Sequence, residues 1–119
     1  MATRKITLTM ILLLVFMATI ASAEGKSSKI ASFIQSEVNT NGYKGCQCKS
    51  LGADLVKCNL YFPAGTNTRS VEANTKGVAE LFAQVGRLAV TIHYIGYSGS
   101  QKVCEYKYDM YDATVTKTK

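Results

Sequence analysis

Four cysteines are the residues of this chain with the clearest capacity for chemistry. Cys46, Cys48 and Cys58 fall within one short stretch, and Cys104 lies near the C-terminus. An even number of cysteines in a small chain that leaves the cytoplasm is typical of a disulfide framework, and the N-terminus described below predicts export. We therefore expect two structural disulfides that involve Cys46, Cys48, Cys58 and Cys104.

The cysteine spacing restricts how these residues pair. Cys46 and Cys48 are two positions apart, so on one extended strand their Cα atoms would lie about 6.7 Å from each other. That is the upper limit of disulfide geometry, and a Cys46–Cys48 bridge is therefore disfavoured. One of the two should bond Cys58 and the other Cys104, with a preference for Cys48–Cys58 together with Cys46–Cys104.

Two other uses of the cysteines are alternatives to this framework. Four thiolates on one face could bind zinc, but the spacing lacks the paired CxxC knuckles of structural zinc sites. The Cys46-Gln47-Cys48 pair could instead be a thiol-redox centre. Such a centre needs an exposed thiolate of low pKa, whereas these side chains are expected to face the core.

Catalytic patterns beyond the cysteines are sparse. The single histidine, His93, occupies a polar position in the middle of a predicted strand. The chain has no glycine-rich phosphate loop, no GxSxG nucleophile elbow and no close pair of carboxylates in an apolar setting. Asp109 and Asp112 would lie on opposite faces of an extended strand. We expect neither an enzyme nor a protein that needs a cofactor or a metal.

The N-terminus reads as a targeting segment. Arg4 and Lys5 precede an apolar run over residues 6–20, and Ala21-Ser22-Ala23 supplies the small residues of a cleavage site. This pattern predicts a secretory signal peptide over residues 1–23. An uncleaved membrane anchor would need an apolar stretch of about 20 residues or more. We therefore expect a secreted or periplasmic protein with no stable membrane span in the mature chain.

The mature chain, residues 24–119, is long enough for one small domain. Of the 14 basic residues, loss of Arg4 and Lys5 leaves 12 against 8 acidic ones, a net charge of +4. This moderate basic excess favours anionic partners.

Apolar periodicity predicts two helices. In the first, Ile30, Phe33, Ile34 and Val38 recur at helical spacing after Ser27-Ser28, and Asn41-Gly42 should end the helix. In the second, Asn67 or Thr68 caps a longer helix that Gly86 should stop. Gly77, in its middle, is expected to mark a close contact between helix and sheet.

Period-two alternation predicts four strands. In residues 46–49 and 56–62, cysteines and apolar residues occupy the even positions, whereas Gln47, Lys49, Lys57, Asn59 and Tyr61 occupy the odd ones. Directly opposed residues share a face, so the first two strands should pair even with even, which sets either Cys48 or Cys46 opposite Cys58. Two further alternating strands follow, from Leu88 to Ile95 and from Cys104 to Tyr111.

The element order α-β-β-α-β-β predicts an α+β fold. We expect a two-layer sandwich in which two helices cover one face of a four-stranded, mainly antiparallel sheet, stapled by disulfides. Residues 114–119 have no apolar anchor and should form a frayed tail.

The outer face of this sheet is the candidate binding surface. Basic and aromatic side chains at alternate positions gather there, and the candidate ligand-binding residues are Lys49, Lys57, Tyr61, His93, Lys107 and Tyr111. Lysines beside tyrosines on a sheet can hold an anion by charge while the rings cover apolar parts of the ligand. We expect a binding module for an anionic lipid head group or glycan, or for a protein partner. Export argues against nucleic acid.

Overall fold

The structure is a computed structural model that describes residues 25–40, 45–84 and 88–118. The element order along the chain is α2 (Lys26–Thr40), β1 (Cys46–Gly52), β2 (Leu55–Phe62), α3 (Thr68–Ala83), β3 (Thr91–Ser98), β4 (Gln101–Asp109) and β5 (Thr114–Lys117). The predicted signal peptide over residues 1–23 lies outside the described residues, as do Asn41-Gly42 and Gly86, the predicted helix ends.

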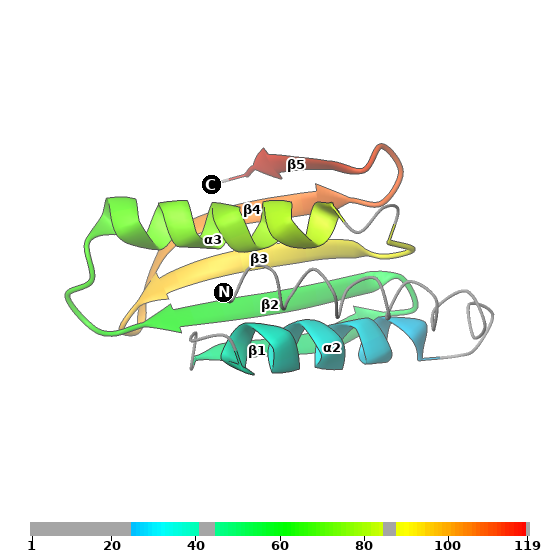
Figure 1. The fold of residues 1–119 in the computed structure, drawn as a ribbon, viewed down its shortest axis with the longest axis horizontal. Coiled ribbons are helices and arrows are strands. Elements are labelled where there is room, and N and C mark those ends of the chain that lie inside the picture. Colours follow the sequence, from blue (N-terminus) through cyan, green and yellow to red (C-terminus); the bar gives the residue numbers. More distant parts are fainter. Residues whose placement is uncertain (1–24, 41–44, 85–87, 119) are drawn as a thin grey trace.

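The five strands form one sheet in the order β1-β2-β3-β4-β5. Neighbouring strands are antiparallel except β2 and β3, which are parallel. The α+β class is confirmed, but the prediction of four strands was wrong, because the sheet has a fifth strand and is mixed. Parallel neighbours need a crossover connection, and α3 supplies it between β2 and β3 (Figure 1).

The fifth strand comes from the segment predicted to be a frayed tail. Ala113 adopts a left-handed backbone (φ 55°), which turns the chain back so that Thr114–Lys117 pairs with β4. Val115 lies opposite Tyr108 and packs against the core. Packing of Val115, the pairing with β4 and an ion pair between Lys117 and Glu72 of α3 hold this segment in place.

Both helices cover the same face of the sheet, as predicted (Figure 1). α2 packs on β1 and β2, and α3 packs on β3 and β4. Asn67 is the N-cap of α3: its side-chain oxygen accepts hydrogen bonds from the backbone N–H groups of Arg69 and Ser70. This satisfies two of the amides that a helix start leaves without partners.

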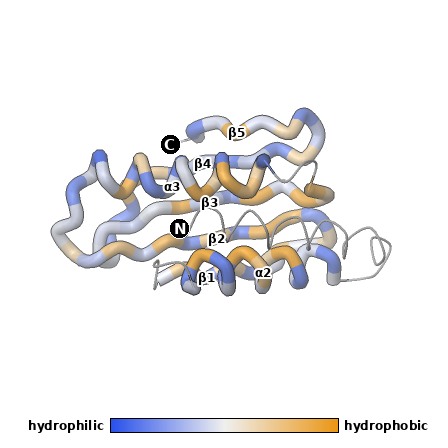
Figure 2. The backbone as a smooth tube through the Cα atoms, in the orientation of Figure 1, coloured by the Kyte–Doolittle hydropathy of each residue, from blue (hydrophilic) through white to orange (hydrophobic). Residues whose placement is uncertain are grey.

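The core fills the space between the helices and the even-numbered residues of the sheet. Hydrophobic residues recur along α2, α3 and the strands that they cover (Figure 2). Its largest fully buried side chains include Tyr94, Tyr108, Phe82 and Ile30. The close contact between helix and sheet is at Gly96 of β3: a Cβ there would lie 2.4 Å from Thr75 Oγ1 of α3. The expectation that Gly77 marks this contact was wrong, because a Cβ at Gly77 would meet nothing within 4 Å.

The register of the first hairpin follows the alternation. Cys48 pairs with Cys58 and Lys49 pairs with Lys57, so even positions oppose even positions. An irregularity between Ser50 and Gly52 absorbs the residue that would otherwise shift the register. Because of this bulge, the even-numbered residues of β1 share a face with the even-numbered residues of β2.

The helices of the described segments are short. None of them is long and apolar enough to cross a membrane.

Candidate functional site

The face of the sheet opposite the helices carries a row of basic side chains. Strand pairing aligns Lys49 with Lys57, Lys57 with His93, and His93 with Lys107. These four residues therefore occupy one register row across β1 to β4, which we call the basic row. With strands about 4.8 Å apart, the row spans about 14 Å. Four of the six predicted ligand-binding residues are thus brought together.

Carboxylates contact both residues of the β3–β4 half of the basic row. Glu105 Oε2 lies 3.2 Å from His93 Nδ1, and its Oε1 lies 2.8 Å from Lys102 Nζ. The hydrogen bond from Lys102 and, to a lesser extent, that from His93 lower the pKa of the Glu105 carboxyl. Lys107 Nζ lies 3.7 Å from a carboxylate oxygen of Asp109. This half of the row is a compensated surface.

The β1–β2 half of the row keeps its charge. Among the residues that the structure describes, neither Lys49 nor Lys57 forms an ion pair. The two lysines are directly opposite each other, an arrangement that destabilises a strand pair. Both line a pocket of about 330 Å³ together with Gln35, Gln47, Cys48 and Asn59. The pocket therefore combines two uncompensated positive charges with three side-chain amides.

The two predicted ligand-binding tyrosines, Tyr61 and Tyr111, lie in different parts of the structure. Tyr61 pairs with Tyr97 of β3, and their rings stack with centroids 4.9 Å apart. Asn59 of the pocket donates a hydrogen bond to the Tyr61 hydroxyl. Tyr111 does not join the basic row, because it follows the end of β4 in the turn to β5, where it is 74% exposed.

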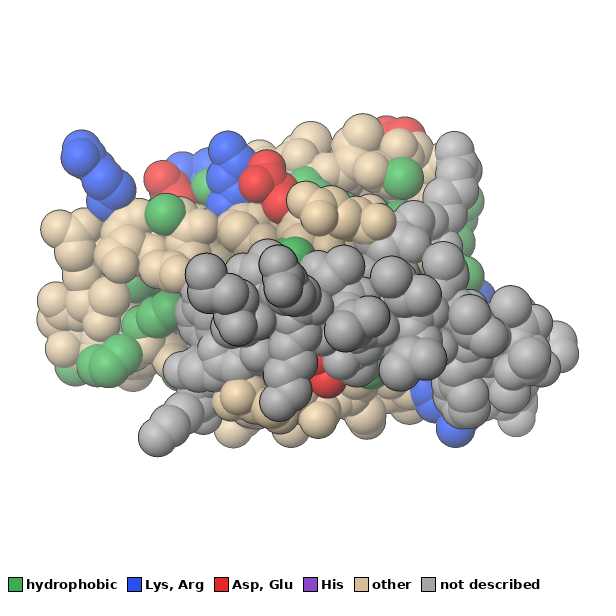
Figure 3. Space-filling model, in the orientation of Figure 1, with side chains coloured by type: hydrophobic (Ala, Val, Ile, Leu, Met, Phe, Trp, Pro, Cys, Tyr) green, Lys and Arg blue, Asp and Glu red, His purple; other side chains and the backbone are tan. Residues whose placement is uncertain are grey.

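The helix-bearing face has a different charge pattern. Basic and acidic side chains lie beside one another at the β5 side of α3 (Figure 3). One such contact is the ion pair between Lys117 of β5 and Glu72 of α3. The opposed lysines of the pocket thus differ from this paired arrangement at β5 and α3.

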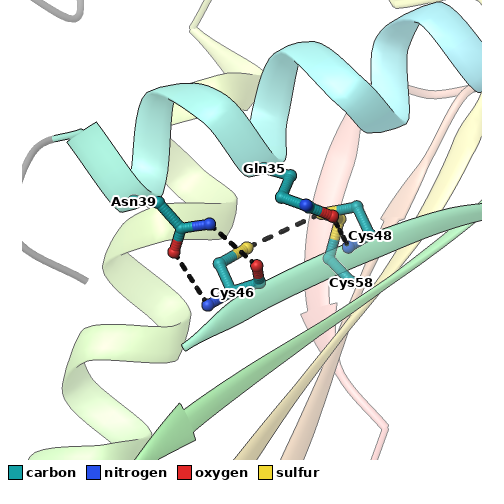
Figure 4. The surroundings of a disulfide bond; sticks show 5 residues. All are labelled: Gln35, Asn39, Cys46, Cys48 and Cys58. Atoms are coloured by element: carbon teal, nitrogen blue, oxygen red, sulfur yellow. Dashed lines mark hydrogen bonds between the residues drawn. A yellow bond between two sulfur atoms is a disulfide. The ribbon is translucent and has the colours of Figure 1, made fainter. Parts of the chain in front are cut away.

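A second chemical feature, the cysteine cluster of Cys46, Cys48 and Cys58, lies beneath α2 (Figure 4). Cys48 and Cys58 form a disulfide, as preferred from the sequence. The predicted Cys46–Cys104 bridge was wrong, and both residues are buried free thiols. Cys46 pairs with Leu60, Leu60 with Gly96, and Gly96 with Cys104, so three strand spacings separate the two cysteines.

Helix α2 satisfies the outer edge of β1 with its side chains. Asn39 accepts a hydrogen bond from the Cys46 backbone N–H and donates one to the Cys46 carbonyl, both 3.0 Å long. The Cys48 N–H donates to Gln35 Oε1 at 2.8 Å, and Ser27 Oγ donates to the Gly52 carbonyl. Gln35 and Asn39 of α2 thus occupy hydrogen-bonding positions along this strand edge. These bonds protect an edge that would otherwise be open to pairing with another chain.

The Cys46 thiol is buried and protonated in this structure. Its side chain is 2% exposed, and burial raises the pKa of the thiol to about 12. Tyr94, which is fully buried, is the titratable neighbour in electrostatic contact with it. Burial, followed by the charges of Cys46 and Tyr108, raises the pKa of Tyr94, so both groups are neutral at ordinary pH.

The described residues offer no cluster of three or more histidine, cysteine, aspartate or glutamate side chains that could hold a metal ion. Two of the four cysteines are joined to each other. The zinc alternative therefore has no ligand set in this part of the chain.

Several residues of the site were not identified from the sequence. Gln47 and Asn59 occupy odd positions of the hairpin, so the alternation that selected the lysines places them on the same face. Gln35 and Asn39 are four residues apart on one side of α2, a spacing that aligns them with β1 but does not by itself identify a target.

Comparisons of this chain with known protein families, with curated proteins and with solved structures found no match.

Proposed function

We propose that this protein is an exported, non-enzymatic binding module that holds an anionic glycan on the open face of its sheet. The observation that carries the proposal is the Lys49–Lys57 pair, two opposed lysines without acidic partners at a pocket of about 330 Å³. An anion between the two ammonium groups would relieve their repulsion. The bound state would therefore gain an interaction that the free protein lacks.

The lining of the pocket favours a carbohydrate over a lipid surface. Gln35, Gln47 and Asn59 line the pocket with side-chain amides. The Gln35 oxygen already accepts from the Cys48 N–H and the Asn59 oxygen is buried, so Gln47 and the amide nitrogens are the groups that suit hydroxyls beside a carboxylate or sulfate. Its volume lies in the range of small-molecule sites, about 300–1,000 Å³. Insertion into a membrane would need exposed apolar side chains. The large exposed apolar residues of the described chain are Leu51, Tyr61 and Tyr111, none of which belongs to the basic row.

The predicted signal peptide supports export, and so does the disulfide. Disulfides form and persist in oxidising compartments and are rare in the cytosol. A glycan in the envelope or outside the cell would then be accessible to the pocket.

The test is salt-dependent binding by the purified protein. The probes are polygalacturonate, a sulfated polysaccharide, and vesicles containing anionic phospholipid. We expect binding to at least one polysaccharide that weakens as salt screens the charges. The double variant Lys49→Gln/Lys57→Gln should bind about tenfold more weakly, a loss of about 1.4 kcal/mol.

The matched control is Lys29→Gln/Lys76→Gln. It removes the same charge from exposed positions on α2 and α3. An equal loss in both double variants would reduce the effect to net charge and contradict the pocket. Binding to vesicles alone would replace the glycan with a lipid head group. The absence of salt-sensitive binding to all three probes would refute the proposal.

A further inference from the structure

The three sulfur atoms of the cysteine cluster lie within reach of one another. Cys46 Sγ is 3.6 Å from Cys48 Sγ, which is itself bonded to Cys58 (Figure 4). A free thiol beside a disulfide sulfur has the arrangement that thiol–disulfide exchange requires. Cys104, the other free thiol, is three strands away and cannot take part.

The two ends of the disulfide differ in burial. Cys58 is fully buried, whereas Cys48 is half-buried and lines the pocket that holds Lys49 and Lys57. An incoming sulfur would therefore approach the disulfide at Cys48, on the edge strand β1, rather than at Cys58. The side chains of Lys49 and Lys57 lie on the other face of the same hairpin, and their charge would attract a negatively charged reagent to this edge.

We propose that Cys48–Cys58 is a thiol–disulfide exchange site for small anionic thiols, with Cys46 as the second, resolving thiol. In the first step the external thiolate attacks Cys48 Sγ and forms a mixed disulfide. The Cys48–Cys58 bond breaks, and the Cys58 sulfur leaves with the electron pair and takes up a proton.

In the second step Cys46 gives up its proton and attacks Cys48 Sγ. The Cys46–Cys48 bond forms, and the external thiol leaves as the thiolate that entered. The proton lost by Cys46 balances the one gained by Cys58. The sequence moves one disulfide from Cys58 to Cys46, without net oxidation, and returns the external thiol unchanged.

The fold keeps this exchange dormant until Cys48 is attacked. Cys46 is buried, and both of its backbone hydrogen-bonding groups are held by Asn39. Cα atoms two residues apart on an extended strand are about 6.7 Å from each other, at the limit for a disulfide. Formation of Cys46–Cys48 therefore requires β1 to shorten and to leave Asn39. Such a local change is feasible because β1 is an edge strand.

The sequence provides a direct assay, because trypsin separates the partners. Cys46 and Cys48 share the peptide 45–49, Cys58 lies in 58–69, and Cys104 lies in 103–107. The native protein is treated with glutathione, an anionic thiol, or with cysteamine, a cationic one. The exchange is then stopped with acid, and the free thiols are alkylated. After digestion with trypsin, the peptides are identified by mass. We expect glutathione to react faster than cysteamine, and the difference to vanish in Lys49→Gln/Lys57→Gln.

In the unsubstituted protein, Cys58 should become alkylated while peptide 45–49 gains an internal disulfide. In Cys46→Ala, the glutathione adduct should instead remain on Cys48. Cys104→Ala, which also truncates a buried cysteine, should behave like the unsubstituted protein. If Cys46→Ala does not fold, Cys46→Ser provides the same comparison, and the internal disulfide can be detected without any variant.

Three results would overturn the proposal. The first is a Cys58 that stays unlabelled in the native protein. The second is a mixed disulfide that persists equally with and without Cys46, which would leave the resolving thiol without a role. The third is equal reaction with both reagents, which would remove the preference for anionic thiols. None of these results depends on whether a glycan binds.

Discussion

Replacement of Gly96 by alanine tests the closest packing in the fold. A Cβ at this position would lie 2.4 Å from Thr75 Oγ1, 2.8 Å from Val71 Cγ1 and 3.0 Å from Cys104 Sγ. Thr75 cannot turn away without loss, because its buried hydroxyl donates a 2.7 Å hydrogen bond to the Val71 carbonyl. The added methyl group would therefore push α3 away from β3.

The expected cost follows from these contacts. Overpacking of a well-packed core destabilises by about 1–3 kcal/mol. The backbone of Gly96 is not left-handed, so alanine also restricts the unfolded chain and recovers about 0.4–1 kcal/mol. We expect a net loss of about 1–2 kcal/mol. For a domain of this size, that loss lowers the midpoint of thermal unfolding by roughly 5–10 °C.

Gly77→Ala is the matched control, since it makes the same chemical change in the middle of α3. Its Cβ would meet nothing within 4 Å. It should stabilise the protein by up to about 1 kcal/mol through helix propensity. Thermal unfolding followed by circular dichroism under non-reducing conditions measures both variants. A Gly96→Ala midpoint at or above that of the unsubstituted protein would refute the close packing of α3 on β3.

Three further substitutions test the surfaces around the core. Lys57→Glu places a carboxylate opposite Lys49 and should raise the free energy of unfolding by up to about 1 kcal/mol. Denaturant titration would measure this gain, which should fade at high salt; a loss of stability would contradict the lysine repulsion. Asn39→Ala leaves the Cys46 backbone groups without their partners and should cost about 1–3 kcal/mol. Hydrogen exchange of the Cys46 amide should accelerate, and unchanged protection would show that Asn39 does not hold the edge. Glu105→Gln should lower stability at neutral pH but not in acid. The folded-state pKa of Glu105 is lowered, so its contribution is present above the unfolded value of about 4.3 and is lost as pH falls through the folded value. The unfolding midpoints of Glu105→Gln and of the unsubstituted protein should therefore converge as pH falls. A difference between them that stays constant with pH would refute the pairing of Glu105 with Lys102 and His93.

The alternation of side chains was sufficient to predict which face each residue of the first hairpin occupies. Even-to-even pairing follows from it, but this left either Cys48 or Cys46 opposite Cys58, and the structure has the preferred Cys48–Cys58 disulfide. Alternation does not determine strand order or direction. The parallel pairing of β2 with β3 puts Cys104 three strands from Cys46, and no local pattern contains that information. The prediction of a Cys46–Cys104 bridge was wrong for this reason.

The candidate site was predictable to the same extent. Alternation places Lys49, Lys57 and His93 on one face, but their alignment in one row depends on register across the parallel pair. The contact of His93 with Glu105 depends on the β3–β4 register, which brings the two residues side by side. Tyr111 was misplaced because β4 ends at Asp109, before the alternation in the sequence ends.

The disulfide and the lysine pair occupy adjacent register rows, and this adjacency couples the two proposals. Cys48–Cys58 is next to Lys49–Lys57 along the hairpin. A disulfide between residues separated by 10 positions contributes about 3 kcal/mol in the entropic description. The repulsion of opposed lysines costs at most about 1 kcal/mol, so the disulfide can hold the two charges together.

Cleavage of Cys48–Cys58 should therefore weaken anion binding although every charge remains. The measurement is polysaccharide affinity before and after glutathione treatment, with circular dichroism as the check that the sheet persists. Lys29→Gln/Lys76→Gln should show the same redox dependence, because its pocket is unchanged. An affinity that is identical in both thiol states would mean that the main-chain ladder alone positions the lysines. The disulfide would then stabilise the fold without shaping the site.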